Sequence, residues 1–258
     1  MQNVLALLRR ELGASFDSPL AYFVVPTYVA LVGGFALWFD DVFAAGVASP
    51  RGIFFWSGLF LVLLAPAVTM RLLAEERRTG SLELLASLPL RDEELILGKF
   101  LAAVVLVGTA LSATLPMVGM LAWLGTPEVA GDAAPRIVRA FTQTGLDAGP
   151  VATGYLGLLL AGSALCAVGL AASAWTSNQV IAFLVALVLS IFPWAAGYFV
   201  GRLPADLQPW VTMLTFQPHL DNLFKGVVDT RDLVYWAGVT AVFLHAAVYS
   251  LERRRWTA

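Results

Sequence analysis

Charged residues and cysteines are scarce in this sequence. Asp, Glu, Lys and Arg make up 13% of its 258 residues, about half the share of an ordinary soluble domain. The net charge is −2, so no basic excess indicates nucleic-acid binding. A single cysteine, Cys166, excludes an intramolecular disulfide, and its apolar surroundings predict a buried core residue. The apolar residues, 59% of the chain, therefore decide its class.

These apolar residues gather in six runs, each about 20 residues long, the length that a helix needs to cross a bilayer. The predicted spans are 20–39, 52–70, 100–124, 151–175, 180–200 and 233–251. Four of them contain a proline, which membrane helices tolerate where neighbouring groups satisfy the freed backbone. The sequence therefore predicts an all-α integral membrane protein with six transmembrane helices, in a single domain over residues 1–258.

Lysine and arginine predict the orientation, because cytoplasmic segments carry the larger share of them. With the N-terminus inside, the inner segments hold ten of these residues and the outer segments six. The pair Arg77 and Arg78 and three consecutive arginines after the last span account for most of the difference. We therefore expect both termini and residues 71–99 on the cytoplasmic face.

The N-terminal residues 1–17 predict an interfacial helix that lies on the membrane surface. Apolar residues recur there at helical spacing, and the charged residues lie off that stripe. The stripe consists of Met1, Val4, Leu5, Leu8 and Leu12.

The fourth span carries small residues every three or four positions, which lets another helix approach closely. We interpret this pattern as packing within the subunit rather than as a subunit interface. The residues are Gly157, Ala161, Ala164, Ala167 and Ala171.

The polar segment 71–99 lies between the second and third spans. Leucines at helical spacing predict a short amphipathic helix that Pro89 ends, with Gly80 at its N-cap and Glu83 three residues later. The next helix would begin with Asp92, Glu93 and Glu94, where the helix dipole favours negative charge. The residues alone allow either a helix docked on a cytoplasmic partner or a solvated loop with an interfacial helix. The leucines are Leu82, Leu84, Leu85 and Leu88.

Residues 201–232 are apolar but are interrupted by three prolines, so they cannot form one continuous span. We expect two short helices at the outer leaflet, one with the spacing of residues 207–214 and one over residues 219–227. Trp210 and Phe216 should then lie at the membrane interface, with His219, Asp221 and Lys225 facing water or a partner subunit. The alternative is an ordinary surface loop.

Five blocks, in order along the chain, resemble ABC-2 type transporter permeases, most closely the subfamily of the gliding-motility permease subunit. The central block is EERRTGSLELLASLPL followed by ILGKF. The other four are SPLAYFVVPTYVALVGGFALWF, GYLGLLLAGSALCAVGLAASAWTSNQVIAF, HLDNLFKGVVDTRDLVYW and LERRRW.

This resemblance implies the membrane half of an exporter for a lipid, a glycan or a hydrophobic compound, or an envelope-associated ABC complex. Such a subunit pairs with a second permease copy and with separate ABC ATPase subunits, in a bacterial or archaeal cytoplasmic (inner) membrane. An auxiliary envelope protein and membrane lipid are further expected partners. The chain lacks the phosphate loop G-x-x-x-x-G-K-[ST], so we expect ATP and Mg²⁺ on the ATPase, and neither a cofactor nor a metal here.

By the same resemblance, residues 71–99 hold a coupling helix that passes the closure of the ATPases to the membrane helices. The implied coupling residues are Glu75, Glu76, Arg77, Gly80, Leu82, Glu83, Leu84, Leu85 and Pro89. The short helices of residues 201–232 would be re-entrant and would close an outer gate. The gate residues are Trp210, Phe216, His219 and Asp221.

Two other functions deserve a test. Ser163 and His245, on the fourth and sixth spans, could serve a rhomboid-like intramembrane serine protease, although the sequence around Ser163 is AGSA and not the rhomboid G-x-S-G. An ATP-independent transporter would be expected to show intramembrane charges or inverted repeats, and neither is evident in the sequence.

Overall fold

The computed structural model describes residues 2–17, 19–39, 49–81, 91–124 and 147–255, and all regular structure within these ranges is helical. The long helices that follow the N-terminal α1 (Gln2–Asp17) are α2 (Pro19–Phe39), α3 (Arg51–Thr69), α6 (Asp92–Ser112), α9 (Ala148–Trp175), α10 (Gln179–Phe199) and α13 (Thr230–Arg255). The shorter ones are α4 (Ala74–Thr79), α7 (Leu115–Leu124), the 3₁₀ turn η1 (Val200–Arg202), α11 (Gln208–Leu214) and α12 (Phe216–Phe224).

Six segments of the described chain are long and apolar enough to cross a membrane, and they correspond to the six predicted spans. The third differs most, because α6 begins at Asp92 and the predicted span began at Phe100. That span is also divided at Ala113 and Thr114, after which α7 begins. The Thr114 hydroxyl donates to the carbonyl of Leu111 at 2.7 Å and so binds a backbone oxygen beside the break.

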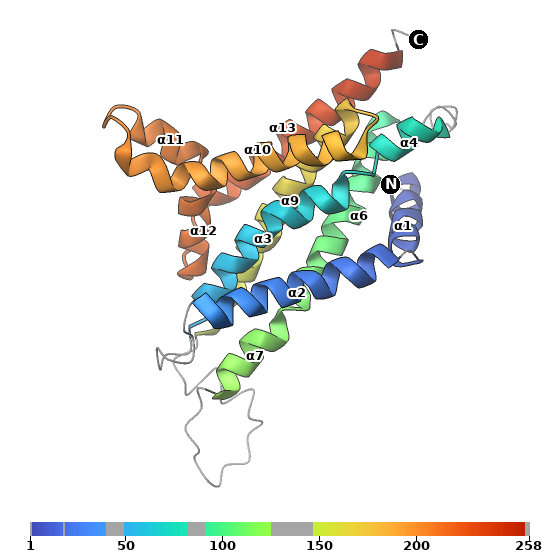
Figure 1. Ribbon diagram of the computed structural model, residues 1–258. Coiled ribbons are helices and arrows are strands. Elements are labelled where there is room, and N and C mark those ends of the chain that lie inside the picture. The colour runs from blue at the N-terminus through green and yellow to red at the C-terminus, as the bar shows by residue number, and fades with distance from the viewer. Residues whose placement is uncertain (1, 18, 40–48, 82–90, 125–146, 256–258) are drawn as a thin grey trace.

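Helix α9 lies at the centre of the bundle and contacts α3, α6, α10 and α13 (Figure 1). The predicted stripe of small residues on this helix is buried within the subunit, as expected. A Cβ added at Gly154 would lie 2.5 Å from Phe54 of α3, and one added at Gly162 would lie 2.9 Å from Val107 of α6. The small residues therefore allow α9 to approach both neighbours closely.

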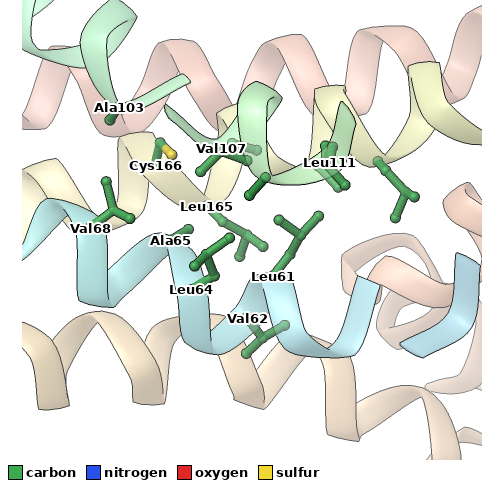
Figure 2. Packing of buried hydrophobic residues seen from close by; sticks show 14 of the residues in the cluster. Leu61, Val62, Leu64, Ala65, Val68, Ala103, Val107, Leu111, Leu165 and Cys166 are labelled. Atoms are coloured by element: carbon green, nitrogen blue, oxygen red, sulfur yellow. The ribbon is translucent and has the colours of Figure 1, made fainter. Parts of the chain in front are cut away.

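The apolar core fills the space between α3, α6 and α9. Leu61, Ala65 and Val68 of α3 lie near Leu165 and Cys166 of α9 in the close view (Figure 2). Cys166 is fully buried there, as its apolar surroundings predicted.

The two ends of the bundle differ in what they carry. The start of α1, the end of α13, α4 and the turn between α9 and α10 gather at one end, whereas α7, α11 and α12 lie toward the other (Figure 1). The assignment of the first end to the cytoplasm remains the prediction from the Lys and Arg counts. We call these the α4 end and the α12 end.

Helix α1 packs against α6, and the contact of its predicted apolar stripe with the membrane surface stays a prediction. Leu7, which was not in the stripe, is buried, and a Cβ at Gly98 of α6 would lie 2.7 Å from its Cβ. Leu5, which was in the stripe, is 53% exposed. The helix therefore has one side on α6 and keeps part of its apolar surface free.

Two short helices, α11 and α12, are present in residues 201–232, as predicted, although α12 (Phe216–Phe224) begins and ends three residues before the predicted range 219–227. Phe216 is not at an interface as expected: it is 4% exposed, and its ring centroid lies 5.2 Å from that of Trp236 on α13. Trp210 on α11 is 69% exposed, and its place at the membrane interface stays a prediction. Helix α12 is thus part of the core, whereas α11 contacts mainly α10 and η1.

Candidate functional site

At the α4 end, Ser173 of α9 holds the junction between α3 and α4. Its hydroxyl oxygen accepts hydrogen bonds from the backbone N–H groups of Leu73 and Ala74, at 3.1 and 3.0 Å. The same hydroxyl donates to the carbonyl of Met70 at 3.0 Å. The first N–H groups of a helix have no partner within it, so Ser173 supplies one from a neighbouring helix and fixes the start of α4 to α9.

Lys99 of α6 is the central charge at this end and is only 1% exposed. Its Nζ lies 2.8 Å from Oε1 of Glu11 on α1 and 2.7 Å from Oε1 of Glu76 on α4. A buried ammonium is stable only when it is paired in this way. The three residues, which we call the Lys99 cluster, therefore join α1, α4 and α6.

The sequence pattern did not predict the Lys99 cluster. The sequence did contain a signal for it, because Lys99 is a charged residue in a part of α6 that is otherwise apolar. Its partners could not be found from spacing, since Glu11 is 88 residues and Glu76 is 23 residues away in the chain.

A crevice of about 260 Å³ opens beside the Lys99 cluster, between α1, α3, α4 and α6. One part of its wall is charged and the other is apolar. The charged residues are Arg10, Glu11, Arg71, Glu75, Glu76 and Lys99. The apolar residues include Val68, Leu72, Ala102, Ala103 and Leu106.

The implied coupling residues are described only in part. Glu75, Glu76 and Arg77 lie on α4, a helix that the sequence pattern did not predict. Gly80 ends α4 with a left-handed φ of 73°, which glycine adopts without strain, whereas we had expected it only at the start of a following helix. The remaining coupling residues lie outside the described ranges, and these are Leu82, Glu83, Leu84, Leu85 and Pro89.

The start of α6 is as predicted, with three acidic residues in its first turn. Oε2 of Glu94 accepts the backbone N–H of Arg91 at 3.3 Å and also the side-chain amide of Asn3 on α1 at 3.1 Å. A glutamate at this position satisfies an N–H that the helix leaves free. Glu94 therefore caps α6 and ties α1 to it.

At the α12 end, His219 forms a second polar cluster rather than facing water. Its Nδ1 lies 2.6 Å from Oδ1 of Asp232 at the start of α13, and the amide of Asn222 donates to Oδ2 of Asp232 at 3.0 Å. The His219 ring stacks on Tyr235 with centroids 4.0 Å apart. Asp232 is buried, so these contacts fasten α12 to α13. Asp221, the fourth expected gate residue, is exposed.

The described residues do not favour a serine protease. The Ser163 hydroxyl donates to the carbonyl of Leu160 in its own helix at 2.7 Å, and His245 is exposed on α13. A nucleophilic serine would instead need a base within hydrogen-bonding reach of its hydroxyl.

The comparison with protein families identifies the class of this chain. The family model described as ABC-2 family transporter protein matches residues 53–256. Because the match covers well over half of the chain, the protein belongs to the ABC-2 transporter family and is a multi-pass membrane permease. Permeases of this family are components of membrane transport rather than enzymes, and they generally work with an ABC ATPase. A search of curated proteins found no match.

Proposed function

We propose that this chain is the permease subunit of an ATP-driven ABC exporter, coupled through residues 71–99 to a separate ATPase subunit. The observation that carries the proposal is the attachment of α4 to the membrane helices. Family membership supports an ATPase partner, and the Lys99 cluster and Ser173 supply the connection within the subunit.

A displacement of α4 would be transmitted to two membrane helices. Its start is hydrogen-bonded to α9 through Ser173, and Glu76 in its first turn is paired with Lys99 of α6. Networks of hydrogen bonds, ion pairs and rigid helices are the physical means by which one site biases another. An ATPase that moves the segment after α4 would therefore act on the central helix α9 and on α6 together.

The complete transporter consists of two permease copies, or one copy and a related permease, above two ATPase subunits that bind ATP and Mg²⁺. Both termini and α4 face the cytoplasm of a bacterial or archaeal cell, and the cargo is a lipid, a glycan or a hydrophobic compound. An envelope-associated complex with an auxiliary protein, as in the gliding-motility subfamily, fits the same architecture.

In this transporter the exposed helix α11 closes the exit on the outer side. Trp210 carries that role, because it is exposed while α12 beside it is held in the core by Phe216 and His219. Trp210→Ala should change transport or its coupling to ATP hydrolysis and leave the ATPase bound. Transport by the purified complex in lipid nanodiscs, with quenching of tryptophan fluorescence by brominated lipid, measures this. Unchanged transport together with insensitivity to the quencher would make α11 an ordinary surface helix.

The coupling assignment is tested with Leu85→Asp, which places a charge in the expected apolar contact with the ATPase. Loss of the contact made by a centrally buried interface residue commonly weakens binding by about 2 kcal/mol or more. We expect loss of ATPase co-purification or of transport, with normal membrane insertion. The matched control is Leu207→Asp, the same substitution at an exposed leucine toward the α12 end, which should keep the ATPase. Retention of both binding and transport by Leu85→Asp would overturn the assignment.

A further inference from the structure

Helix α7 is joined to α6 by a break that Pro116, the second residue of α7, explains. A proline has no N–H, and its ring clashes with the carbonyl four residues earlier, so Ser112 cannot receive the bond that would continue α6. The Leu111 carbonyl instead accepts the backbone N–H of Thr114 at 3.0 Å and its hydroxyl at 2.7 Å. The first turn of α7 tolerates Pro116, because N–H groups there have no partner within the helix. The break is therefore a property of the sequence of the third span.

Tyr155 of the central helix α9 contacts the break from the side. Its hydroxyl oxygen lies 2.9 Å from that of Thr114, which is fully buried. A hydroxyl has one hydrogen to donate, and Thr114 donates its own to Leu111, so Tyr155 is the donor in this contact. The Tyr155 ring packs edge-on against Phe54 of α3, with centroids 5.4 Å apart. A side chain that is positioned by α3 and α9 therefore binds the residue at the break.

The two sides of the break differ in how extensively they are packed. Helix α6 contacts α1, α2, α3, α9 and α13, whereas no helix of the described chain contacts α7 to a similar extent. One face of α7 is buried through Val118 and Leu121, and Met117 lies against Gly33 of α2, where an added Cβ would collide with it. Loss of such contacts costs little within a bilayer, because lipid chains are as apolar as the side chains they replace. Helix α7 can therefore move while α6 stays in place.

We propose that the break is a hinge about which α7 swings towards and away from α2, and that the Tyr155 hydroxyl holds the closed position seen in this structure. Hinges consist of a few residues at the ends of helices that absorb the backbone change. The bond from Tyr155 to Thr114 belongs to the closed position, because rotation of α7 displaces the residue directly before its first turn. In the open position Met117 leaves Gly33, and the bundle opens to the membrane between α2 and α7. The proposal concerns the position of one helix, so it holds whatever the ATPase partner or the cargo.

The test measures the distance between α6 and α7 in the full-length protein. Spin labels are attached to Leu101→Cys on α6 and Met120→Cys on α7, two exposed positions, in a Cys166→Ala background. Pulsed electron paramagnetic resonance in lipid nanodiscs gives the distance distribution, and dilution with unlabelled chain removes distances between copies. We expect a closed and an open distance, with the closed one predominant in the wild type. A control pair at Leu101→Cys and Val188→Cys, on α6 and α10, should give one distance.

Tyr155→Phe tests the hydrogen bond, because it removes the donor, keeps the ring and leaves no buried donor unpaired. It should raise the ratio of open to closed protein by about three- to tenfold, the effect of one neutral hydrogen bond. Tyr249→Phe, at an exposed tyrosine of α13, is the matched control and should leave the ratio unchanged. Thr114→Ser, which keeps the accepting hydroxyl, should also resemble the wild type. Equal ratios in Tyr155→Phe and Tyr249→Phe would overturn the role of Tyr155.

Pro116→Ala tests the location of the hinge. Alanine restores an N–H that the Ser112 carbonyl can accept, so α6 and α7 should join into one helix and give a single distance. One unchanged distance in both the wild type and Tyr155→Phe would show a fixed kink. Two distances that persist in Pro116→Ala would place the motion elsewhere in the chain. Either result would overturn the proposal.

Discussion

Removal of the buried ammonium is the most direct test of how α4 is fastened. Lys99→Met keeps most of the side-chain volume but leaves the carboxylates of Glu11 and Glu76, which are 13% and 14% exposed, without their shared cation. Breaking a buried ion pair by removing one partner costs about 3–5 kcal/mol, because an uncompensated charge stays behind. We therefore expect a large loss of stability from a single substitution.

Each kcal/mol lowers the melting temperature of a chain of this length by about 2–4 °C, so Lys99→Met should melt on the order of 10 °C below the wild type. The measurement is the fraction of purified protein that remains monodisperse after heating in detergent. Lys225→Met, at an exposed lysine on the α12 side, is the matched control and should change stability by no more than about 0.5 kcal/mol.

A triple variant, Lys99→Met with Glu11→Gln and Glu76→Gln, separates charge from packing. It removes all three charges and should recover most of the lost stability, because no charge is left without a partner. A triple variant as unstable as Lys99→Met would show that the loss comes from packing. A single variant as stable as the wild type would refute the cluster itself.

Three further changes test other contacts. Ser173→Ala leaves two buried N–H groups at the start of α4 without their acceptor and should cost about 1–3 kcal/mol. The control Ser163→Ala removes a hydroxyl that donates to Leu160 of its own helix, and it should change the melting temperature little. Equal melting temperatures of the two variants would contradict the capping role of Ser173. Gly154→Val places side-chain atoms against the ring of Phe54, which lies only 2.5 Å from the position that a Cβ would take. The variant should lose about 1–3 kcal/mol of stability. An unchanged melting temperature would show that α3 and α9 are further apart. Single cysteines at Ser81 and Asp132 in a cysteine-free background test the orientation. An impermeant reagent on intact cells should label the cysteine at position 132 and not the one at position 81. Labelling at position 81 alone would show that the orientation is the reverse of the predicted one.

The sequence predicted the spans well because the bilayer imposes a length and a polarity on each of them. The predicted limits of the spans near α3, α9 and α10 differ from the helices by three residues or fewer. The same local reasoning found α11 from helical spacing between prolines, and it placed the second helix, α12, three residues too late. It also predicted that the small residues of α9 are buried, because the spacing of small residues along a single helix is enough to indicate close packing.

The mistaken expectations share one cause, which is that spacing along a helix does not say which neighbour covers it. Phe216 was assigned to an interface because it is aromatic, but Trp236 of α13 covers it. His219 was expected to face water or a partner subunit, but Asp232 and Tyr235 of α13 contact it. Each error concerns a partner on another helix.

The sequence by itself determined an all-helical membrane chain with six spans, because hydrophobic length is a local property. Only the tertiary structure decided what holds the α4 end together. Lys99, Glu11 and Glu76 meet from three helices, and Ser173 reaches α4 across about 100 residues of chain. A buried charge requires partners, but nothing in the periodicity of its own helix says which residues they are.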